Sequence, residues 1–339
     1  MYQMMKKFIQ KVTNKENFTI EEAMQAMDII MDGKATSAQI AGLIIALKLK
    51  GENVEDVSGF LKSMRKHSLK VKISDENTVD GCGTGGDGSH SFNISTAAAL
   101  VASAAGVTVA KHGNRSISSK CGSADLLEKA GGKIDLSPEK VERNIRKIGF
   151  GFMFAPYFHP AMKYAATPRK ELGVRTIFNI LGPMTNPASV KRQLVGVFDK
   201  KLLPLIAEAL MSSGSKHVIT AHSQDGLDEF SVSAPTDYFE MKNSHVNQVT
   251  LVPEDVGLSS YPPQVLIGGD ANKNLNILND VLNGKKSPYR DAVLLNSGVL
   301  LYLGKKAEDI KEGVLLSAQA IDNGAAKQKL SDWIRESNR

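Results

Sequence analysis

The chain has 339 residues, 42% hydrophobic and 23% charged, which is typical of a folded soluble protein long enough for two domains. Its 42 Lys and Arg against 36 Asp and Glu give a net charge of +6, which favours anionic small molecules as ligands. No run of Lys and Arg marks a nucleic-acid patch, and a single Trp argues against base stacking. We therefore expect no nucleic-acid partner.

The sequence also argues against a membrane protein. Residues 1–7 are basic, but no apolar core follows them, so we expect no signal peptide. The longest apolar stretch, 97–110, is dominated by small residues and is too short to span a bilayer. Cys82 and Cys121, the only two cysteines, make no disulfide scaffold and suit a reducing compartment. We expect a cytoplasmic protein with no membrane partner.

The first seventy residues predict three helices. Residues 19–22, Thr-Ile-Glu-Glu, are a capping box that begins a helix ending near Gly33. A second helix follows over about 37–50 and is closed by Gly51. A third has apolar residues three and four positions apart over 54–64, which defines one buried face. We expect these helices to pack as a small bundle.

From about Thr78 the pattern changes to alternating strands, loops and helices. Residues 78–80 predict a strand before a glycine loop, and Ser95 or Thr96 would cap an Ala-rich helix that stops at Gly106. The later predicted elements are strands at 107–110, 194–198 and 217–221, a helix at 202–213, a hairpin of 238–241 with 248–251, and a buried helix at 292–303. This alternation predicts a mostly parallel sheet flanked by helices, with ligands at the carboxyl ends of its strands.

The segment 167–187 interrupts the alternation. It predicts a helix between Pro168 and Gly182-Pro183, which we assign to the N-terminal bundle. The fold class is therefore α/β, with a small discontinuous helical domain and a larger α/β domain. The expected bounds are 1–72 with about 165–190 for the helical domain, and 73–164 with 191–339 for the α/β domain.

Two loops of the α/β part are rich in anion-binding groups. Residues 81–88, GCGTGGDG, offer backbone N–H groups that no Cβ shields. Residues 111–119, KHGNRSISS, add the cations Lys111 and Arg115 and a row of hydroxyls. Residues 93–96 stand at a helix start, where unpaired N–H groups attract phosphate. Together these segments predict a pocket for a highly phosphorylated small molecule.

The glycine loop also has the G-x-G-x-x-G spacing of dinucleotide-binding folds, at residues 83–88. That fingerprint needs a helix opening within the glycines and an acidic residue about twenty positions on. Here the predicted helix begins only at Ser95, and the next predicted strand ends in Lys111. We therefore do not expect NAD binding. A Walker A loop is excluded because no Gly-Lys-Ser/Thr closes the segment.

The acidic pair Asp228 and Glu229 stands at the end of another loop. Such a pair is ordinarily a solvated surface feature, but beside phosphate-binding loops it suits Mg²⁺, which prefers carboxylate, water and phosphate oxygens. His112 and His159 have no His or Cys at ligand spacing, so we expect no transition metal. His112 stays open as an acid, a base or a hydrogen-bond donor.

In order along the chain, these motifs resemble those of the anthranilate phosphoribosyltransferase family. The matching segments are Gly83-Thr84-Gly85-Gly86-Asp87, Asn93-Ile94-Ser95-Thr96, Lys111-His112-Gly113-Asn114-Arg115, Arg169-Lys170-Glu171-Leu172-Gly173, Phe178-Asn179, Gly182-Pro183 and Asp228-Glu229. The resemblance implies a homodimer joined through the helical domains. It also implies transfer of the phosphoribosyl group of 5-phosphoribosyl 1-pyrophosphate (PRPP) to the amine of anthranilate, a step of tryptophan biosynthesis. A pyrimidine nucleoside phosphorylase of the same fold and a non-catalytic PRPP-binding regulator are the alternatives, although intact Asp228, Glu229 and Arg169 speak against the regulator.

The resemblance further assigns residues to each ligand. For PRPP it implies Gly83, Gly86, Asp87, Ser91, Asn93, Ile94, Ser95, Thr96, Lys111, His112, Gly113, Asn114, Arg115, Ser116, Ile117, Ser118, Ser119 and Ser123. For anthranilate it implies Gly83, Asn114 and Arg169, with His112, His159 and Pro183 lining the approach. For Mg²⁺ it implies Ser95, Asp228 and Glu229, and the groups implied as catalytic are Lys111, Arg169, Asp228 and Glu229. Ser91, where threonine is usual, and Cys82 are mild departures from the family pattern.

Overall fold

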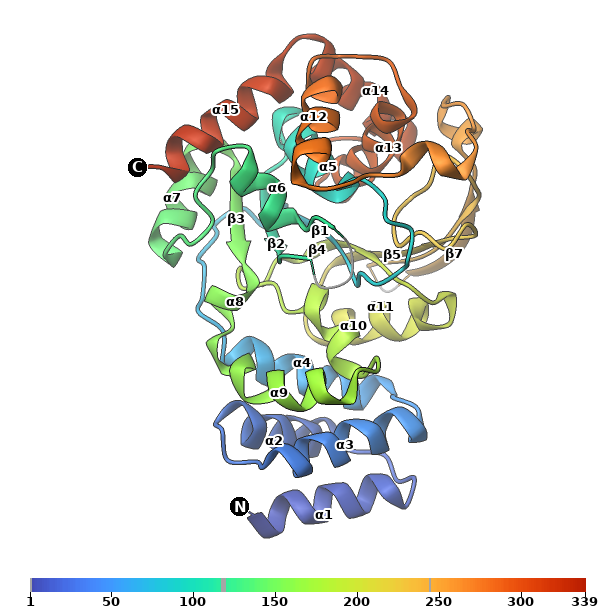
Figure 1. Cartoon of the computed structure of the whole chain (residues 1–339). Coiled ribbons are helices and arrows are strands. Elements are labelled where there is room, and N and C mark those ends of the chain that lie inside the picture. The colour runs from blue at the N-terminus through green and yellow to red at the C-terminus, as the bar shows by residue number, and fades with distance from the viewer. Residues whose placement is uncertain (1, 117–119, 244) are drawn as a thin grey trace.

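The protein has a helical part and a larger α/β part (Figure 1), seen in a computed structural model that describes residues 2–116, 120–243 and 245–339. The helical part carries the N-terminus and lies below the sheet in Figure 1, and the C-terminal helices cover the opposite face of the sheet. This arrangement confirms the predicted fold class.

The three helices predicted from the first seventy residues are present. The helical part consists of α1 (Tyr2–Thr13), α2 (Ile20–Met31), α3 (Ser37–Lys50), α4 (Val54–Lys66), α9 (Lys163–Leu172) and α10 (Ile177–Met184). The predicted capping box begins α2: Thr19 Oγ1 accepts from the N–H of Glu22, and the Glu22 carboxylate accepts from the N–H of Thr19. Gly51 closes α3 as predicted.

The later segment forms two helices where the sequence predicted one. Pro168 lies inside α9 and Pro183 lies inside α10, so neither proline marks a helix end. Gly173 ends α9 with a φ of +61°, and the N–H of Thr176 donates to Asn179 Oδ1 at the start of α10. Both helices pack against α3, so the helical domain is discontinuous, as expected.

A seven-stranded sheet forms the centre of the α/β part, in the order β3-β2-β1-β4-β5-β6-β7. Its strands are β1 (Val79–Gly83), β2 (Val109–Gly113), β3 (Phe150–Phe154), β4 (Arg192–Gly196), β5 (His217–Ser223), β6 (Thr236–Lys242) and β7 (His245–Leu251). The first five strands run parallel, and β6 and β7 form an antiparallel hairpin at one edge. The mostly parallel sheet and the hairpin are thus confirmed, whereas the sequence did not indicate β3. Ser244, in the expected hairpin turn, lies outside the described residues.

Strand β2 begins later than predicted. It starts at Val109, whose N–H donates to the carbonyl of Gly149 and which pairs with Phe150 of β3. Lys111 is therefore the third residue of the strand, and the prediction that the strand delivers Lys111 at its end is wrong. The cause is pairing with β3, which sets the register of β2 from a distant part of the chain.

Helices cover both faces of the sheet. One face is packed by α5 (Ile94–Ala104) and α13 (Pro288–Leu303), and the other by α11 (Leu203–Ser212) together with the helical part. The remaining helical elements are α6 (Ser123–Lys129), α7 (Pro138–Ile148), α8 (Ala155–Phe158), α12 (Ala271–Leu282), α14 (Ile310–Asp322) and α15 (Ala325–Ser337), with short 3-10 turns η1 (Pro160–Met162), η2 (Lys200–Leu202), η3 (Pro253–Val256) and η4 (Pro263–Leu266).

Side chains alternate across the central strands β4 and β5 and so belong to two different hydrophobic cores. Leu194 and Ile219 belong to the core beneath α5 and α13. Val195 and Val218 belong to a second core, which α2, α3 and α4 share with α11. Arg65 of α4 strengthens this junction, because its buried guanidinium donates to the carbonyl of Met184 at the end of α10. None of the helices in the described part of the chain combines the length and apolar character that crossing a membrane requires.

Candidate active site

Three loops meet at the carboxyl ends of the parallel strands. The loop after β1 approaches the loop after β5: the N–H of Gly85 donates to Asp228 Oδ2 at 2.7 Å, and the N–H of Asp228 lies 3.4 Å from Asp87 Oδ2. The loop after β2 continues from Gly113, where an added Cβ would collide with Ser123 Oγ at the start of α6. The structure therefore brings together the glycine loop, the basic loop and the acidic pair, at the edge where parallel sheets bind ligands.

Asp228 lies so close to the sheet that its neighbours must be glycines. A Cβ at Gly83, the last residue of β1, would overlap the Asp228 carboxylate. A Cβ at Gly196, the last residue of β4, would overlap the Asp228 carbonyl oxygen. The glycines at these two strand ends thus allow the acidic pair to sit directly against the sheet edge.

The carboxylates at this edge repel one another. Burial, with the charge of Asp87 nearby, raises the pKa of Asp228, and burial together with Asp228 raises the pKa of Glu229. Lys111 acts against the rise at Glu229. A pair of like charges, of which Asp228 is buried and Glu229 half-buried, fits a divalent cation, because a cation would replace repulsion by attraction. Within the described residues, no three His, Cys, Asp or Glu side chains gather into a metal site made of protein ligands alone.

Lys111 lies beneath the glycine loop. Its side chain is 1% exposed, and Nζ donates to the carbonyl of Gly81 at 2.7 Å and to Ser95 Oγ at 3.4 Å. Burial raises the pKa of Asp80 to about 6, although the charge of Lys111 acts against this rise. Asn186 holds Asp80 in place by donating to its Oδ2 at 2.7 Å. Lys111 therefore supplies a fixed, buried positive charge below the anion-binding amides.

The start of α5 differs from the prediction. The helix begins at Ile94 with Asn93 in the N-cap position, so neither Ser95 nor Thr96 caps it, and that prediction is wrong. The side chain of Asn93 is engaged elsewhere: its Nδ2 donates to the Cys121 carbonyl, and its Oδ1 accepts from Asn274. Ser95 instead reaches Lys111, and the N–H groups of the first turn keep no side-chain cap.

His112 and His159 lie together, with ring centroids 5.1 Å apart. Burial lowers the pKa of both imidazoles, to about 4 for His159 and well below the usual value for His112, so both are neutral at pH 7. Their Nε2 atoms are buried and make no hydrogen bond within the described part of the chain. These rings form an uncharged wall of the site.

Arg169 and Arg115 have different surroundings. Arg169, in the last turn of α9, packs over the Phe178 ring at 5.1 Å, and burial lowers its pKa with no carboxylate acting against it. Among the described residues Arg169 has no ion-pair partner, so it suits an anionic ligand. Arg115 is instead paired with Asp125 at 2.8 Å and with Glu128 at 2.8 Å on α6, which raises its pKa.

The remaining residues implied for PRPP surround the same loops. Asp87 accepts from the N–H and the hydroxyl of Ser89, and Ser91 forms an isolated bridge with Ile267. Ser123 Oγ donates to the Asn114 carbonyl at 3.1 Å. The N–H of Ser116 lies 3.1 Å from Asp125 Oδ2. The positions Ile117, Ser118 and Ser119 lie outside the described residues.

Arg175 is a neighbour of the site that sequence analysis did not single out. It lies between α9 and α10, donates to the carbonyl of Gly86 in the glycine loop, and packs over the Phe198 ring at 4.2 Å. Gly86 has a φ of +72°, so this carbonyl belongs to a conformation that glycine favours. No spacing rule connects residues 86 and 175, and only the fold reveals the contact.

Comparisons with known proteins identify the class and then the family. The a/b domain of the glycosyl transferase family matches residues 75–327, and the helical bundle domain of the glycosyl transferase family matches residues 6–68. These two domains define a glycosyltransferase. The anthranilate phosphoribosyltransferase of Acetivibrio thermocellus is 48% identical over 335 residues, which cover 99% of this chain and 97% of that protein. The chain belongs to the anthranilate phosphoribosyltransferase family.

Further relatives agree with this assignment. The Thermoanaerobacter anthranilate phosphoribosyltransferase is 47% identical over 336 residues, covering 99% of each chain. The crystal structure of the Thermus thermophilus enzyme matches with a TM-score of 0.93 and 39% identity, over 98% of this chain and 99% of that one. The Saccharomyces cerevisiae enzyme in complex with PRPP and Mg matches with a TM-score of 0.90 and 27% identity, over 99% and 98%. The resemblance is confirmed, and none of these comparisons favours the nucleoside phosphorylase alternative.

Proposed function

We propose that this chain transfers the phosphoribosyl group of PRPP to the amine of anthranilate, with Mg²⁺, and releases pyrophosphate. The observation that carries the proposal is that one site contains both negative groups and a positive group without partners of opposite charge in the described part of the chain. Asp228 and the half-buried Glu229 place two carboxylates side by side with no ion-pair partner, and Arg169 has no carboxylate partner, among the described residues. A magnesium-bound polyphosphate and an aromatic acid would correct both.

For PRPP, we propose the amide-rich glycine loop, the first turn of α5 and the basic loop as binding elements. Support comes from the left-handed backbone of Gly86 and Gly88, beside Gly85 whose N–H already binds Asp228, and from the first turn of α5, which has no side-chain cap. Within the basic loop, Arg115 would have to exchange its carboxylate partners on α6 for phosphate, since its guanidinium is already paired.

For Mg²⁺, we propose Asp228, Glu229 and the hydroxyl of Ser95 as ligands. The donor set is all oxygen, which suits this ion, and PRPP phosphates with water would complete the shell. The S. cerevisiae relative has been crystallised with PRPP and Mg, which supports the proposal. When bound, the ion supplies positive charge that favours departure of pyrophosphate.

For anthranilate, we propose that the Arg169 guanidinium binds the carboxylate and so orients the amine. The neutral rings of His112 and His159, with Pro183 of α10, line the approach. The S. cerevisiae relative in complex with 4-fluoroanthranilate supports an aromatic acid as ligand. An aromatic amine is uncharged at pH 7, so positioning it needs no base to remove a proton first.

In the reaction, the bond between C1 and the pyrophosphate oxygen breaks while a bond forms between C1 and the anthranilate nitrogen. The nitrogen then loses one proton to solvent. Negative charge grows on the leaving pyrophosphate, and the buried ammonium of Lys111 with the loop amides stabilises that charge. Catalysis is thus mainly positioning and electrostatics.

We further propose a cytoplasmic homodimer formed through the helical part, residues 1–72 with about 165–190. The support is apolar surface on that part: Met4 of α1 is 44% exposed and Leu49 of α3 is 79% exposed. Light scattering on the wild type and on Leu49→Asp would test it. A wild-type monomer would overturn the dimer.

The test of the function is incubation with PRPP, Mg²⁺ and anthranilate, followed by the loss of anthranilate fluorescence. Turnover that requires all three components supports the proposal. Phosphorolysis of thymidine or uridine without anthranilate turnover would favour the nucleoside phosphorylase. PRPP binding without turnover would identify a regulator.

A further inference from the structure

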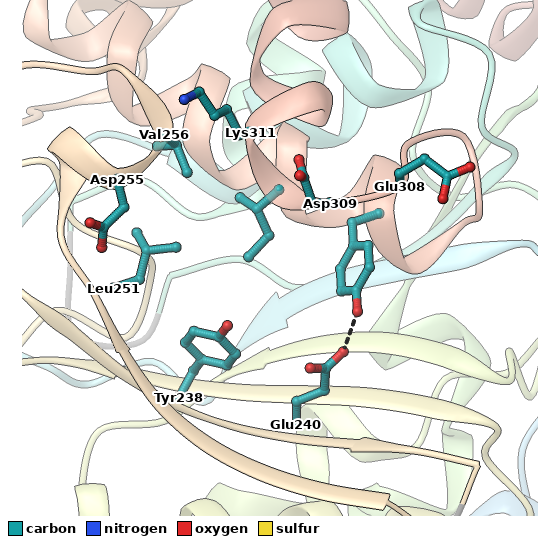
Figure 2. Close-up of a pocket in the computed structure, with 10 residues that line it drawn as sticks. Tyr238, Glu240, Leu251, Asp255, Val256, Glu308, Asp309 and Lys311 are labelled. Atoms are coloured by element: carbon teal, nitrogen blue, oxygen red, sulfur yellow. Dashed lines mark hydrogen bonds between the residues drawn. The ribbon is translucent and has the colours of Figure 1, made fainter.

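A cavity of about 320 Å³ lies at the antiparallel edge of the sheet, and the reaction does not use it (Figure 2). It is formed by β6, β7 and η3 below and beside it, and by the end of α13 and the start of α14 on the other side. Its lining residues are Tyr238, Glu240, Leu251, Asp255, Val256, Tyr302, Glu308, Asp309, Ile310 and Lys311. None of them belongs to the loops of the active site.

The charge of this cavity is strongly negative. Its lining contains four carboxylates, of Glu240, Asp255, Glu308 and Asp309, against the ammonium of Lys311 and that of Lys242, which donates to the Tyr302 hydroxyl from outside the lining. These negative charges act on the wall of the cavity. Burial together with the charges of Glu240 and Asp255 raises the pKa of Tyr238 to about 12. A ligand with a net negative charge is repelled here, and a cation is attracted.

Glu240 is a fixed anion at the floor of the cavity. Its Oε1 accepts from the Tyr302 hydroxyl at 2.8 Å, the dashed contact in Figure 2, and from His217 Nε2 at 2.6 Å. Burial opposes ionisation of Glu240, yet these hydrogen bonds lower its pKa below the usual range. The carboxylate therefore stays charged at neutral pH and holds its position before any ligand arrives.

Tyr238 offers an unused polar group. The residue is only 9% exposed, and Figure 2 shows its hydroxyl pointing into the cavity. This hydroxyl makes no hydrogen bond with any described residue. The aromatic rings of Tyr238 and Tyr302, with Leu251 and Ile310, provide an apolar surface beside it.

We propose that this cavity binds a small organic ammonium ion that carries one aromatic or branched apolar group. The carboxylates hold the ammonium, the Tyr238 hydroxyl takes a hydrogen bond from it, and the tyrosine rings pack against the apolar group. At roughly 30 Å³ for each water-sized group, the volume suits about ten non-hydrogen atoms. Anthranilate, which carries a carboxylate, is excluded by the same charges.

The test uses the full-length protein and 2-phenylethylammonium as the probe, by titration calorimetry and saturation-transfer NMR. Phosphate is the buffer, because Tris is itself an organic ammonium. The shape-matched controls are 2-phenylacetate, which reverses the charge, and 2-phenylethanol, which removes it. We expect saturable one-site binding of the cation in the millimolar range, and no saturable binding of the anion.

Two conservative variants locate the probe. Asp255→Asn removes one charge but keeps an acceptor for the N–H of Val252, and Tyr238→Phe removes the unpartnered hydroxyl. Each should weaken binding, by about tenfold for Asp255→Asn. The matched control is Asp135→Asn, an exposed carboxylate on the loop before α7. Transferase activity, which uses none of these residues, reports that the variants fold.

Three results would overturn the proposal. They are no saturable binding of the cation to the wild type, equal binding of phenylacetate, and unchanged affinity in both cavity variants. The proposal does not depend on the identity of the catalysed reaction, so its failure leaves the transferase assignment untouched.

Discussion

Each side of the active site has charged groups without a partner in the described part of the chain, negative ones on the sheet side and a positive one on the helical side. On the sheet side, Asp228 is buried beside the half-buried Glu229, and their pKa values are raised by burial and by repulsion from neighbouring carboxylates. On the helical side, Arg169 is half-buried over Phe178 and has no anionic partner within the described residues. Arg115, by contrast, is paired with Asp125. The unmatched groups, rather than the paired ones, indicate where ligands would complete the electrostatics.

The largest effect is expected for the double variant Asp228→Asn with Glu229→Gln. Removing both charges takes away the proposed ligands of Mg²⁺, so turnover should fall about a hundredfold or more. The dependence of rate on Mg²⁺ concentration should also change. Steady-state rates over a Mg²⁺ series measure both quantities.

The same variant gives a second readout in thermal unfolding. Mg²⁺ with PRPP should raise the melting temperature of the wild type much more than that of the double variant. Asp225→Asn, on the same loop, is the matched control, because its side chain accepts from the N–H of Leu227 and an amide oxygen can still do so. An unaltered Mg²⁺ response in the double variant would refute the metal assignment.

On the helical side, Arg169→Ala should raise KM for anthranilate by about ten- to a hundredfold, because a charge-assisted hydrogen bond to its carboxylate is lost. PRPP affinity should change little. Lys170→Ala, an exposed neighbour on α9, is the control. Equal losses for both substrates would show that Arg169 has a general structural role instead.

A smaller effect is expected at the contact that joins the two sides. Arg175→Ala removes the donor to the Gly86 carbonyl and should loosen the glycine loop. PRPP binding should weaken by about three- to tenfold, with little change in KM for anthranilate. Arg175→Lys, which keeps the charge and one donor, should recover part of the affinity. If both variants bind PRPP like the wild type, the contact does not order the loop.

The smallest effect is a pH dependence of stability. The folded-state pKa values of Asp228 and Glu229 lie above their ordinary values of 3.8 and 4.5, so the native state binds more protons than the unfolded state. Their contribution to stability is therefore lost as pH rises above these ordinary values and through the folded-state pKa values. Without Mg²⁺, we expect the melting temperature of the wild type to fall by a few degrees more than that of the double variant between pH 7 and 8.5.

Between pH 7 and 8.5, the change in melting temperature reports on the acidic pair and not on the histidines. The pKa values of His112 and His159 are lowered from 6.5, so their contribution to stability changes below neutral pH and is complete above it. Equal slopes for the wild type and the double variant between pH 7 and 8.5 would contradict the raised pKa values.

The sequence predicted those features that short-range chemistry determines. The capping box of Thr19 and Glu22 needs only a four-residue pattern, and Gly51 needs only to follow a helix. The alternation of elements from Thr78 onward was enough for a parallel sheet. Likewise, the glycine loop and the acidic pair were recognisable as candidates by composition and order.

What the sequence missed depends on contacts between distant residues. Strand β2 begins at Val109 because it pairs with β3, a strand that the sequence did not indicate. The sequence did not indicate that Arg115 pairs with Asp125 and Glu128, 10 and 13 positions away on α6, and its contact with PRPP stays a prediction. The contact between Arg175 and Gly86 spans 89 positions. No local pattern contains such information.

The shared core beneath the sheet has a consequence for modularity. The first four helices match a family domain of their own, yet Val195 and Val218 of the sheet pack in the same core as those helices. In a fragment lacking the first 68 residues, the face of the sheet with Val195 and Val218 would be exposed to water, and the fragment would tend to aggregate. A chimera that exchanges the bundle between homologues should therefore include α9, α10 and α11 as well. These helices belong to the same core as the first four, although they come much later in the sequence.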